Sequence, residues 1–278
     1  MLVPFLVFLA ALIGGAASGL ANWSERRRHV ALALSTGTFL GAVFLHLLPD
    51  VAGRTATASV EEHVLHAGAP AAELATGHDH ETSALGAAGD ETAPHGHGDP
   101  TLWLCVLVGV LLVHTVEAVF LRTTERDEVS RHKSVSLVTL AGVSVHAASA
   151  GLGLSALDAG EALTTSFVVA FLTHKAFESF AMVNVFQLAH FSRRRIAWTL
   201  LVFSLLTPIC ILAGRPIFAH VGPDALNIVT ALAAGTFLYV CVAELLPEVF
   251  HHPGDNLAKF TFLLLGVGLS VVLVGFGA

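Results

Sequence analysis

Three ionisable side chains stand close together in the middle of a long apolar segment: His174, Lys175 and Glu178. Such groups are costly and rare inside a membrane span, so they indicate a functional site. His174 and Glu178 are four positions apart and share one face of a helix. His146 lies about halfway along the preceding apolar segment. Two imidazoles and a carboxylate suit a divalent transition metal, with zinc the first expectation; the alternative is that each histidine forms hydrogen bonds between helices.

Lys175 is the least expected of these residues, because an ammonium group repels a bound cation. Three interpretations stay open: the amine is neutral because it is buried, it pairs with a carboxylate, or its positive charge stands in for a second metal ion. From the third we predict that one metal ion rather than two occupies the site. Lys175 is also a candidate for the cation path.

The composition indicates an integral membrane protein. The 278 residues are 54% apolar and 13% charged, with a mean hydropathy of +0.74, whereas soluble domains carry about 25% charged residues. Nothing is basic enough for nucleic acid, and the three cysteines lie in apolar segments, which argues against a disulfide framework. The sequence therefore predicts one all-α transmembrane domain over residues 1–278. Its eight expected spans are 2–22, 30–52, 101–121, 135–157, 162–189, 196–214, 225–250 and 257–277.

Positive charges predict the orientation of these spans. Eleven basic residues flank one set of connections and two flank the other, and the more basic set is expected in the cytoplasm. Both termini are then extracytoplasmic, and the first segment is expected to be a membrane helix rather than a cleaved signal peptide. The cytoplasmic set is Arg26, Arg27, Arg28, Arg122, Arg126, Arg131, Lys133, Arg193, Arg194, Arg195 and Lys259.

Residues 53–100 form the one long loop, which is expected outside the cell. The loop lacks large apolar residues, which argues against a packed domain. Histidines beside carboxylates suit weak capture of borderline cations; the alternative is a polar linker that happens to contain histidines. The six histidines are His63, His66, His78, His80, His95 and His97.

Residues 37–51 and 235–249 are similar without a gap, with eight of fifteen positions identical. Both contain Gly-Thr-Phe-Leu and, later, Leu-Leu-Pro followed by an acidic residue. Because the two segments run in opposite directions across the membrane, they indicate an inverted repeat, which is typical of alternating-access transporters. The expected arrangement is 3+2+3, in which spans one to three and six to eight are related and spans four and five carry the candidate site.

Polar residues of the repeat are candidates for the cation path. His46 and Asp50 in the first copy correspond to Glu244 and Glu248 in the second. They are interpreted either as entry and exit relays or as groups that cap helix ends near water.

Other polar residues of the spans are weaker candidates. Asn184 and Gln187 lie near the inner end of span five and are considered for an exit path. His114 and Glu117 in span three are expected to pack within the bundle rather than bind metal.

The sequence resembles the ZIP (Zrt/Irt-like protein) metal transporters over nearly its whole length. The most specific matches are His146 with Gly151-Leu152, the pair His174-Lys175, and Ala233–Val240 followed by Glu244-Leu245-Leu246-Pro247. The His-Lys pair is similar to the subfamily that includes the animal plasma-membrane zinc importers. The resemblance implies a homodimer and an elevator-like motion of spans one, four, five and six against the other four. It also implies uptake of zinc, and often of iron, manganese or cadmium, and it places His146, His174 and Glu178 on family metal-site positions.

Two positions depart from the family pattern. Many members carry a glutamate four residues after the span-four histidine, where this chain has Ala150. Members with two adjacent metals have a carboxylate or similar ligand after the span-five histidine, where this chain has Lys175. Members with that lysine usually lack the span-five glutamate, whereas this chain keeps Glu178. The departures imply a single three-ligand site.

These observations predict a multi-pass importer of divalent metal ions in a cell membrane, either a bacterial inner membrane or a plasma membrane. The metal ion is its transported substrate, no cofactor is expected, and the protein is not expected to be an enzyme. Because the sequence contains no phosphate-binding glycine-rich motif, transport is expected to run on the ion gradient. The alternative is an intramembrane metal-dependent hydrolase with the same three ligands, although the His-Glu-x-x-His motif of metalloproteases is absent.

Overall fold

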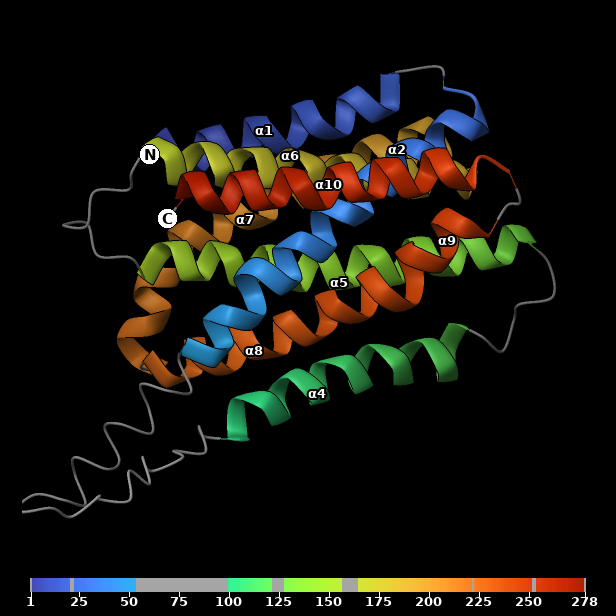
Figure 1. Ribbon diagram of the computed structural model, residues 1–278. Coiled ribbons are helices and arrows are strands. Elements are labelled where there is room, and N and C mark those ends of the chain that lie inside the picture. Colours follow the sequence, from blue (N-terminus) through green and yellow to red (C-terminus); the bar gives the residue numbers. More distant parts are fainter. Residues whose placement is uncertain are drawn as a thin grey trace, which may run out of the picture.

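The computed structural model describes residues 2–20, 23–53, 100–121, 128–156, 165–221, 223–251 and 254–277. Every regular element in these ranges is a helix (Figure 1). In chain order they are α1 (Leu2–Leu20), α2 (Glu25–Ala42), the π-helix η1 (Val43–Leu47), α4 (Pro100–Val116), the π-helix η2 (Glu117–Leu121), α5 (Glu128–Ala156), α6 (Thr165–Leu188), α7 (Arg193–Val221), α8 (Pro223–Tyr239), the π-helix η4 (Val240–Leu245), α9 (Leu246–Phe250) and α10 (Asn256–Gly277).

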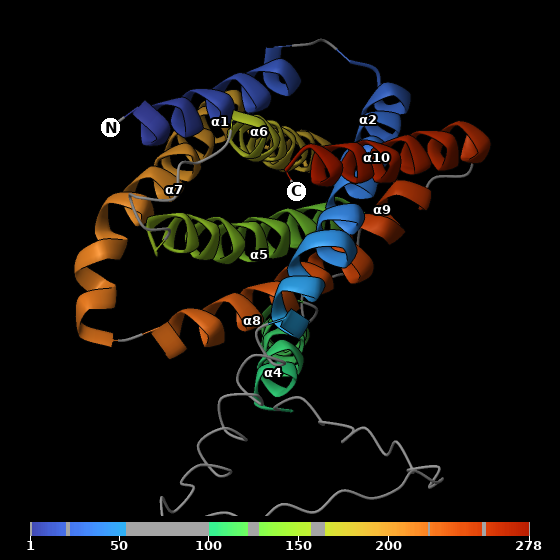
Figure 2. The same ribbon diagram turned by 60° about the vertical axis from the view of Figure 1, so that its left-hand side comes forward.

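Seven helices of the described chain are long and apolar enough to cross a membrane, so the multi-pass prediction is confirmed. The predicted fifth span, α6, is 24 residues long but is not among those seven. Its composition is more polar because it contains His174, Lys175, Glu178, Asn184 and Gln187. α6 packs against α1, α2, α5, α7 and α10, which surround it (Figure 2). A helix enclosed in this way keeps its polar groups away from lipid.

Four helix pairs have the most extensive packing: α2 with α10, α1 with α6, α4 with α8, and α5 with α7. For reference, the helices are divided into two groups. In the α5–α6 group, α1 packs on α6 and α7, and α5 packs on α7. In the α2–α8 group, α2 packs on α10 and α4 packs on α8, with α9 extending α8. The groups meet mainly where α5 crosses α8 and where α2 crosses α6 (Figures 1 and 2).

The two ends of the bundle differ in charge. The start of α1 and the end of α10 lie at the same end (Figure 1), in agreement with the predicted even number of spans. The opposite end, here called the basic end, contains the first turns of α2, α5, α7 and α10. The described basic residues there are Arg26, Arg27, Arg28, Arg131, Lys133, Arg193, Arg194, Arg195 and Lys259.

The two copies of the repeated motif have the same packing role. Gly37 on α2 is so close to α10 that an added Cβ would lie 2.0 Å from the Leu263 carbonyl oxygen. The corresponding Gly235 on α8 is equally close to α4, with 2.0 Å to the Val106 carbonyl oxygen. Small residues at such crossings allow membrane helices to approach through their backbones. The matching contacts support the predicted repeat.

Replacing Gly235 with valine is expected to separate α8 from α4 and to destabilise the protein by about 1–3 kcal/mol, the usual cost of overpacking. The measurement is the thermal unfolding temperature of the purified protein in detergent. Gly268→Val on α10 is the matched control, because an added Cβ there meets nothing within 4 Å. Equal unfolding temperatures for the two variants would contradict the assignment of Gly235 to a tight crossing.

The repeated motif also contains an unusual backbone in both copies. The helical hydrogen bonding changes to the π type over η1 in the first copy and over η4 in the second. When residues 37–51 are aligned with 235–249, Val43–Leu47 falls on Cys241–Leu245, inside η4. π-Helices are rare and are often found at functional sites. His46 and Glu244 occupy equivalent positions in these two segments.

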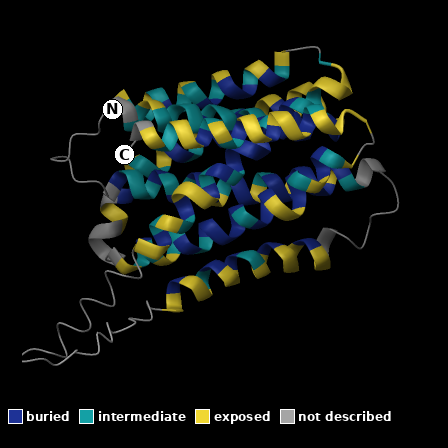
Figure 3. Ribbon diagram, viewed as in Figure 1, coloured by how far each residue is buried: buried dark blue, intermediate teal, exposed yellow. Residues whose placement is uncertain are grey.

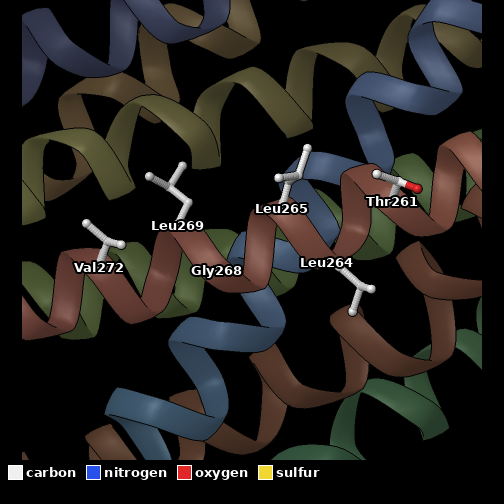
Figure 4. A pocket seen from close by; sticks show the side chains of 6 residues that line it. All are labelled: Thr261, Leu264, Leu265, Gly268, Leu269 and Val272. Carbon is white, nitrogen blue, oxygen red and sulfur yellow. The ribbon is translucent and has the colours of Figure 1, made fainter.

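The outward faces of the helices are apolar. Figure 3 shows exposed residues along the outer sides of α4 and α10 and buried residues along the inner helices. A hollow runs along α10 and is lined by Thr261, Leu264, Leu265, Gly268, Leu269 and Val272 (Figure 4). No ionisable side chain lines it, so its chemistry matches a lipid-facing surface rather than a cation path.

Candidate metal-binding site

His146 on α5 and His174 on α6 face each other inside the bundle. Their Nε2 atoms are 3.3 Å apart, and the ring planes are inclined at 82°. The predicted convergence of these two histidines is therefore present in the structure.

The separation of the two nitrogens suits either of two bonding partners. Without a metal, one imidazole can donate its Nε2 proton to the other. With zinc, two nitrogens at about 2.0–2.1 Å from a tetrahedral ion would lie roughly 3.3–3.4 Å apart. The histidines are thus already at the spacing of two zinc ligands.

Glu178 lies four residues further along α6 and is paired with Lys175. The ammonium Nζ donates to Oε2 at 2.5 Å. Both residues are at most 1% exposed, and the ammonium also lies over the Phe203 ring at 5.0 Å from its centre. Of the three interpretations of Lys175, the geometry corresponds to a lysine paired with a carboxylate.

The carboxylate and the histidines are not gathered into one cluster. Among the described residues, no three His, Cys, Asp or Glu side chains form a group able to hold a metal ion. Oε1 of Glu178 and Nδ1 of His146 are nevertheless among the buried polar atoms of the described residues that have no hydrogen-bond partner. Buried polar atoms are normally satisfied, so these two are available for a ligand or water.

Two aromatic rings from the other helix group cover the histidines. Phe237 on α8 is stacked on the His146 imidazole, with 4.3 Å between ring centres and 5° between planes. Phe39 on α2 meets His174 edge to face, with 6.3 Å between centres, and also contacts Phe237 at 5.1 Å. The sequence analysis did not single out these phenylalanines, although both are the third residue of the repeated Gly-Thr-Phe-Leu.

The candidate path residues of the repeat differ in how far they are exposed. His46 is exposed in η1, within electrostatic range of His146 and His174. Asp50 is partly exposed one turn further on, whereas Glu244 is buried in η4.

Glu248 is 1% exposed at the basic end and forms ion pairs with α5. Arg131 Nη2 lies 3.0 Å from Oε2, and His132 Nδ1 lies 2.7 Å from Oε1. Sequence reasoning missed both partners, because nothing in the spacing of Arg131 and His132 indicates which carboxylate they meet. These ion pairs join the α5–α6 group to the α2–α8 group.

Asn184 and Gln187 also connect the groups near this end. Asn184 is buried and donates to the Arg28 carbonyl oxygen at 2.8 Å. Gln187 donates to the Ser18 carbonyl oxygen at 3.2 Å and accepts a hydrogen bond from the Arg28 guanidinium. Their amides hold α1, α2 and α6 together.

His114 and Glu117 on α4 and η2 are linked through Tyr239 on α8. His114 Nδ1 is 3.0 Å from the tyrosine hydroxyl, which donates to Glu117. This network joins α4 to α8, as expected for polar residues that pack within the bundle. The six histidines predicted to capture metal, within residues 53–100, lie outside the described residues.

Comparisons with known proteins agree on one family. A family model described as ZIP zinc transporter matches residues 71–274. Zinc transporter ZIP9 of Micropogonias undulatus is 28% identical over 299 aligned residues, covering 97% of this chain and 95% of the relative. Zinc transporter ZIP9 of Xenopus tropicalis is 29% identical, with 88% and 84% covered. Zinc transporter 8 of Oryza sativa subsp. japonica is 29% identical, with 65% and 46% covered.

Proposed function

The chain belongs to the ZIP zinc transporter family and is a multi-pass membrane protein, and from this premise we propose that it imports divalent metal ions, zinc foremost, into the cytosol. Its relatives are named zinc transporters, which supports metal-ion transport and does not favour the hydrolase. The metal ion is the cargo. The excess of basic residues supports a cytosolic location for the basic end.

One observation carries the proposal: the 3.3 Å spacing between Nε2 of His146 and Nε2 of His174, which is the spacing of two zinc ligands. Glu178 is proposed as the third ligand through Oε1, which forms no hydrogen bond in the described chain; to reach the ion, its carboxylate has to turn from Lys175 toward the histidines. Water completes the coordination, because a transported ion needs ligands that exchange. Lys175 neutralises part of the charge on Glu178, so the site holds a single ion.

The proposed motion is that of an elevator, in which the α5–α6 group carries the ion past the α2–α8 group. What supports it is that both histidines and Glu178 lie on two helices, α5 and α6, that would move together. We assign His46 and Asp50 as entry relays for the cation on the outer side of the site. Glu244 and Glu248 are the exit relays on the cytosolic side. The protein is proposed to work as a homodimer, as the family resemblance implies.

Zinc uptake into liposomes tests the function directly. The reconstituted protein is expected to accumulate zinc-65 with saturation, and unlabelled iron, manganese and cadmium in competition rank the alternative cargoes. Repeating the assay with and without an imposed pH gradient determines whether protons are coupled. Uptake no faster than in protein-free liposomes at every pH gradient and zinc concentration would contradict the proposal.

A further inference from the structure

The two phenylalanines of the repeat form one ring cluster with the two histidines. The contacts run from His146 to Phe237, from Phe237 to Phe39 and from Phe39 to His174, and the two imidazoles close the circuit. Both phenylalanines are 0% exposed. No water therefore reaches the phenylalanine side of the imidazoles through these rings.

The positions of these rings follow from the repeated motif. Gly37 and Gly235 bring α2 and α8 against α10 and α4. A residue two positions further on is rotated by about 200° around a helix, so Phe39 and Phe237 lie on the opposite side, toward α6 and α5. Each copy of the repeat thus contributes one ring to the site.

The rings restrict the imidazoles in a way that metal binding requires. The second side-chain torsion of a histidine is broad and weakly defined, so two histidines on separate helices do not keep their Nε2 atoms aimed at one point unaided. Parallel stacking at 4.3 Å fixes the plane of His146, and the edge contact of Phe39 limits the rotation of His174.

We propose that Phe237 and Phe39 are positioning residues for the metal ion, and that they make its affinity depend on how the two helix groups are placed. The inference rests on the proposed function. The histidines belong to the α5–α6 group and the phenylalanines to the α2–α8 group. When the groups move past each other, the histidines leave the rings that hold them, zinc binds more weakly, and the ion is released.

Equilibrium binding of zinc-65 to the purified protein in detergent tests the positioning. Phe237→Leu is expected to weaken zinc binding about tenfold, near the upper end of what one aromatic pair contributes. Phe39→Leu is expected to weaken zinc binding to a smaller extent, because the ring centres of Phe39 and His174 are farther apart than those of Phe237 and His146. Cobalt(II) is the second probe: its visible absorption reports ligand geometry, and the spectrum is expected to change in Phe237→Leu.

Phe186→Leu is the matched control. Phe186 is a buried residue of α6 that contacts the Phe191 ring at 4.9 Å, far along the helix from His174. This variant loses a comparable ring contact but is expected to keep the wild-type zinc affinity and cobalt spectrum. If Phe237→Leu does not fold, Phe39→Leu provides the same comparison.

Wild-type zinc affinity with an unchanged cobalt spectrum in the folded phenylalanine variants would overturn the inference. Equal weakening in Phe186→Leu would also overturn it, because the effect would then be one of general packing. Absence of zinc binding by the wild-type protein would instead contradict the proposed function.

Discussion

Replacing His174 with alanine is expected to abolish zinc uptake by the reconstituted protein. The variant removes one of two imidazoles whose nitrogens are 3.3 Å apart and leaves no second nitrogen opposite His146. Loss of outer-shell partners alone weakens metal sites by about 10–100-fold, so loss of a ligand should reduce uptake by at least about 100-fold. The measurement is the initial rate of zinc-65 uptake at saturating and subsaturating zinc.

The control for this variant is a histidine that lies away from the site. His190 is exposed after the end of α6 and has a positive φ of 55°, a conformation that asparagine tolerates. His190→Asn is therefore expected to transport zinc at the wild-type rate. Normal uptake by His174→Ala, in protein that is folded and inserted equally well, would remove His174 from the proposed site.

Replacing Lys175 with methionine is expected to destabilise the metal-free protein by about 3–5 kcal/mol, because removing one partner of a buried ion pair leaves the other charge uncompensated. The unpaired group would be Glu178, which is 0% exposed. Zinc is expected to reverse part of the loss, because the freed carboxylate can then bind the ion. The shift of the unfolding temperature between chelator and excess zinc should therefore be larger in the variant than in the wild type.

A double variant separates charge from packing in this experiment. Lys175→Met combined with Glu178→Leu removes both charges and is expected to recover most of the stability, since apolar replacements of buried ion pairs are often neutral or stabilising. The difference between the effect of the double variant and the sum of the two single effects gives the interaction free energy between Lys175 and Glu178. Two single variants whose effects simply add would show that Lys175 and Glu178 do not depend on each other.

Much of the fold was predictable because the membrane imposes length and apolarity on each spanning helix. Hydropathy located the helices, and the repeat indicated that α2 and α8 play equivalent roles. The facing of His146 and His174 was also predictable, because a short connection between two spans makes them antiparallel neighbours.

The remaining contacts depend on side-chain torsions and on which helices cross. From spacing, Glu178 shares a helix face with His174, yet its carboxylate turns to Lys175 three positions earlier, because a buried carboxylate is stabilised by an opposite charge within hydrogen-bond distance. The ion pair between Arg131 and Glu248 joins distant segments and carries no local signal. The contact of Phe39 and Phe237 with the histidines was indicated in the sequence only by the matching position of the two phenylalanines in the repeat.

The paired π-helices bear on the history of the chain. A π-helix holds an extra residue in its turn and is rare in proteins. A third one, η2, lies outside the repeated motif, so the point in favour of a common origin is the shared position of the other two in the repeat. Here η1 and the matching part of η4 coincide when the copies are aligned. The parsimonious account is that the extra residue was already present in an ancestral half-protein before its gene was duplicated. His46 and Glu244 then descend from one ancestral position and diverged after the duplication.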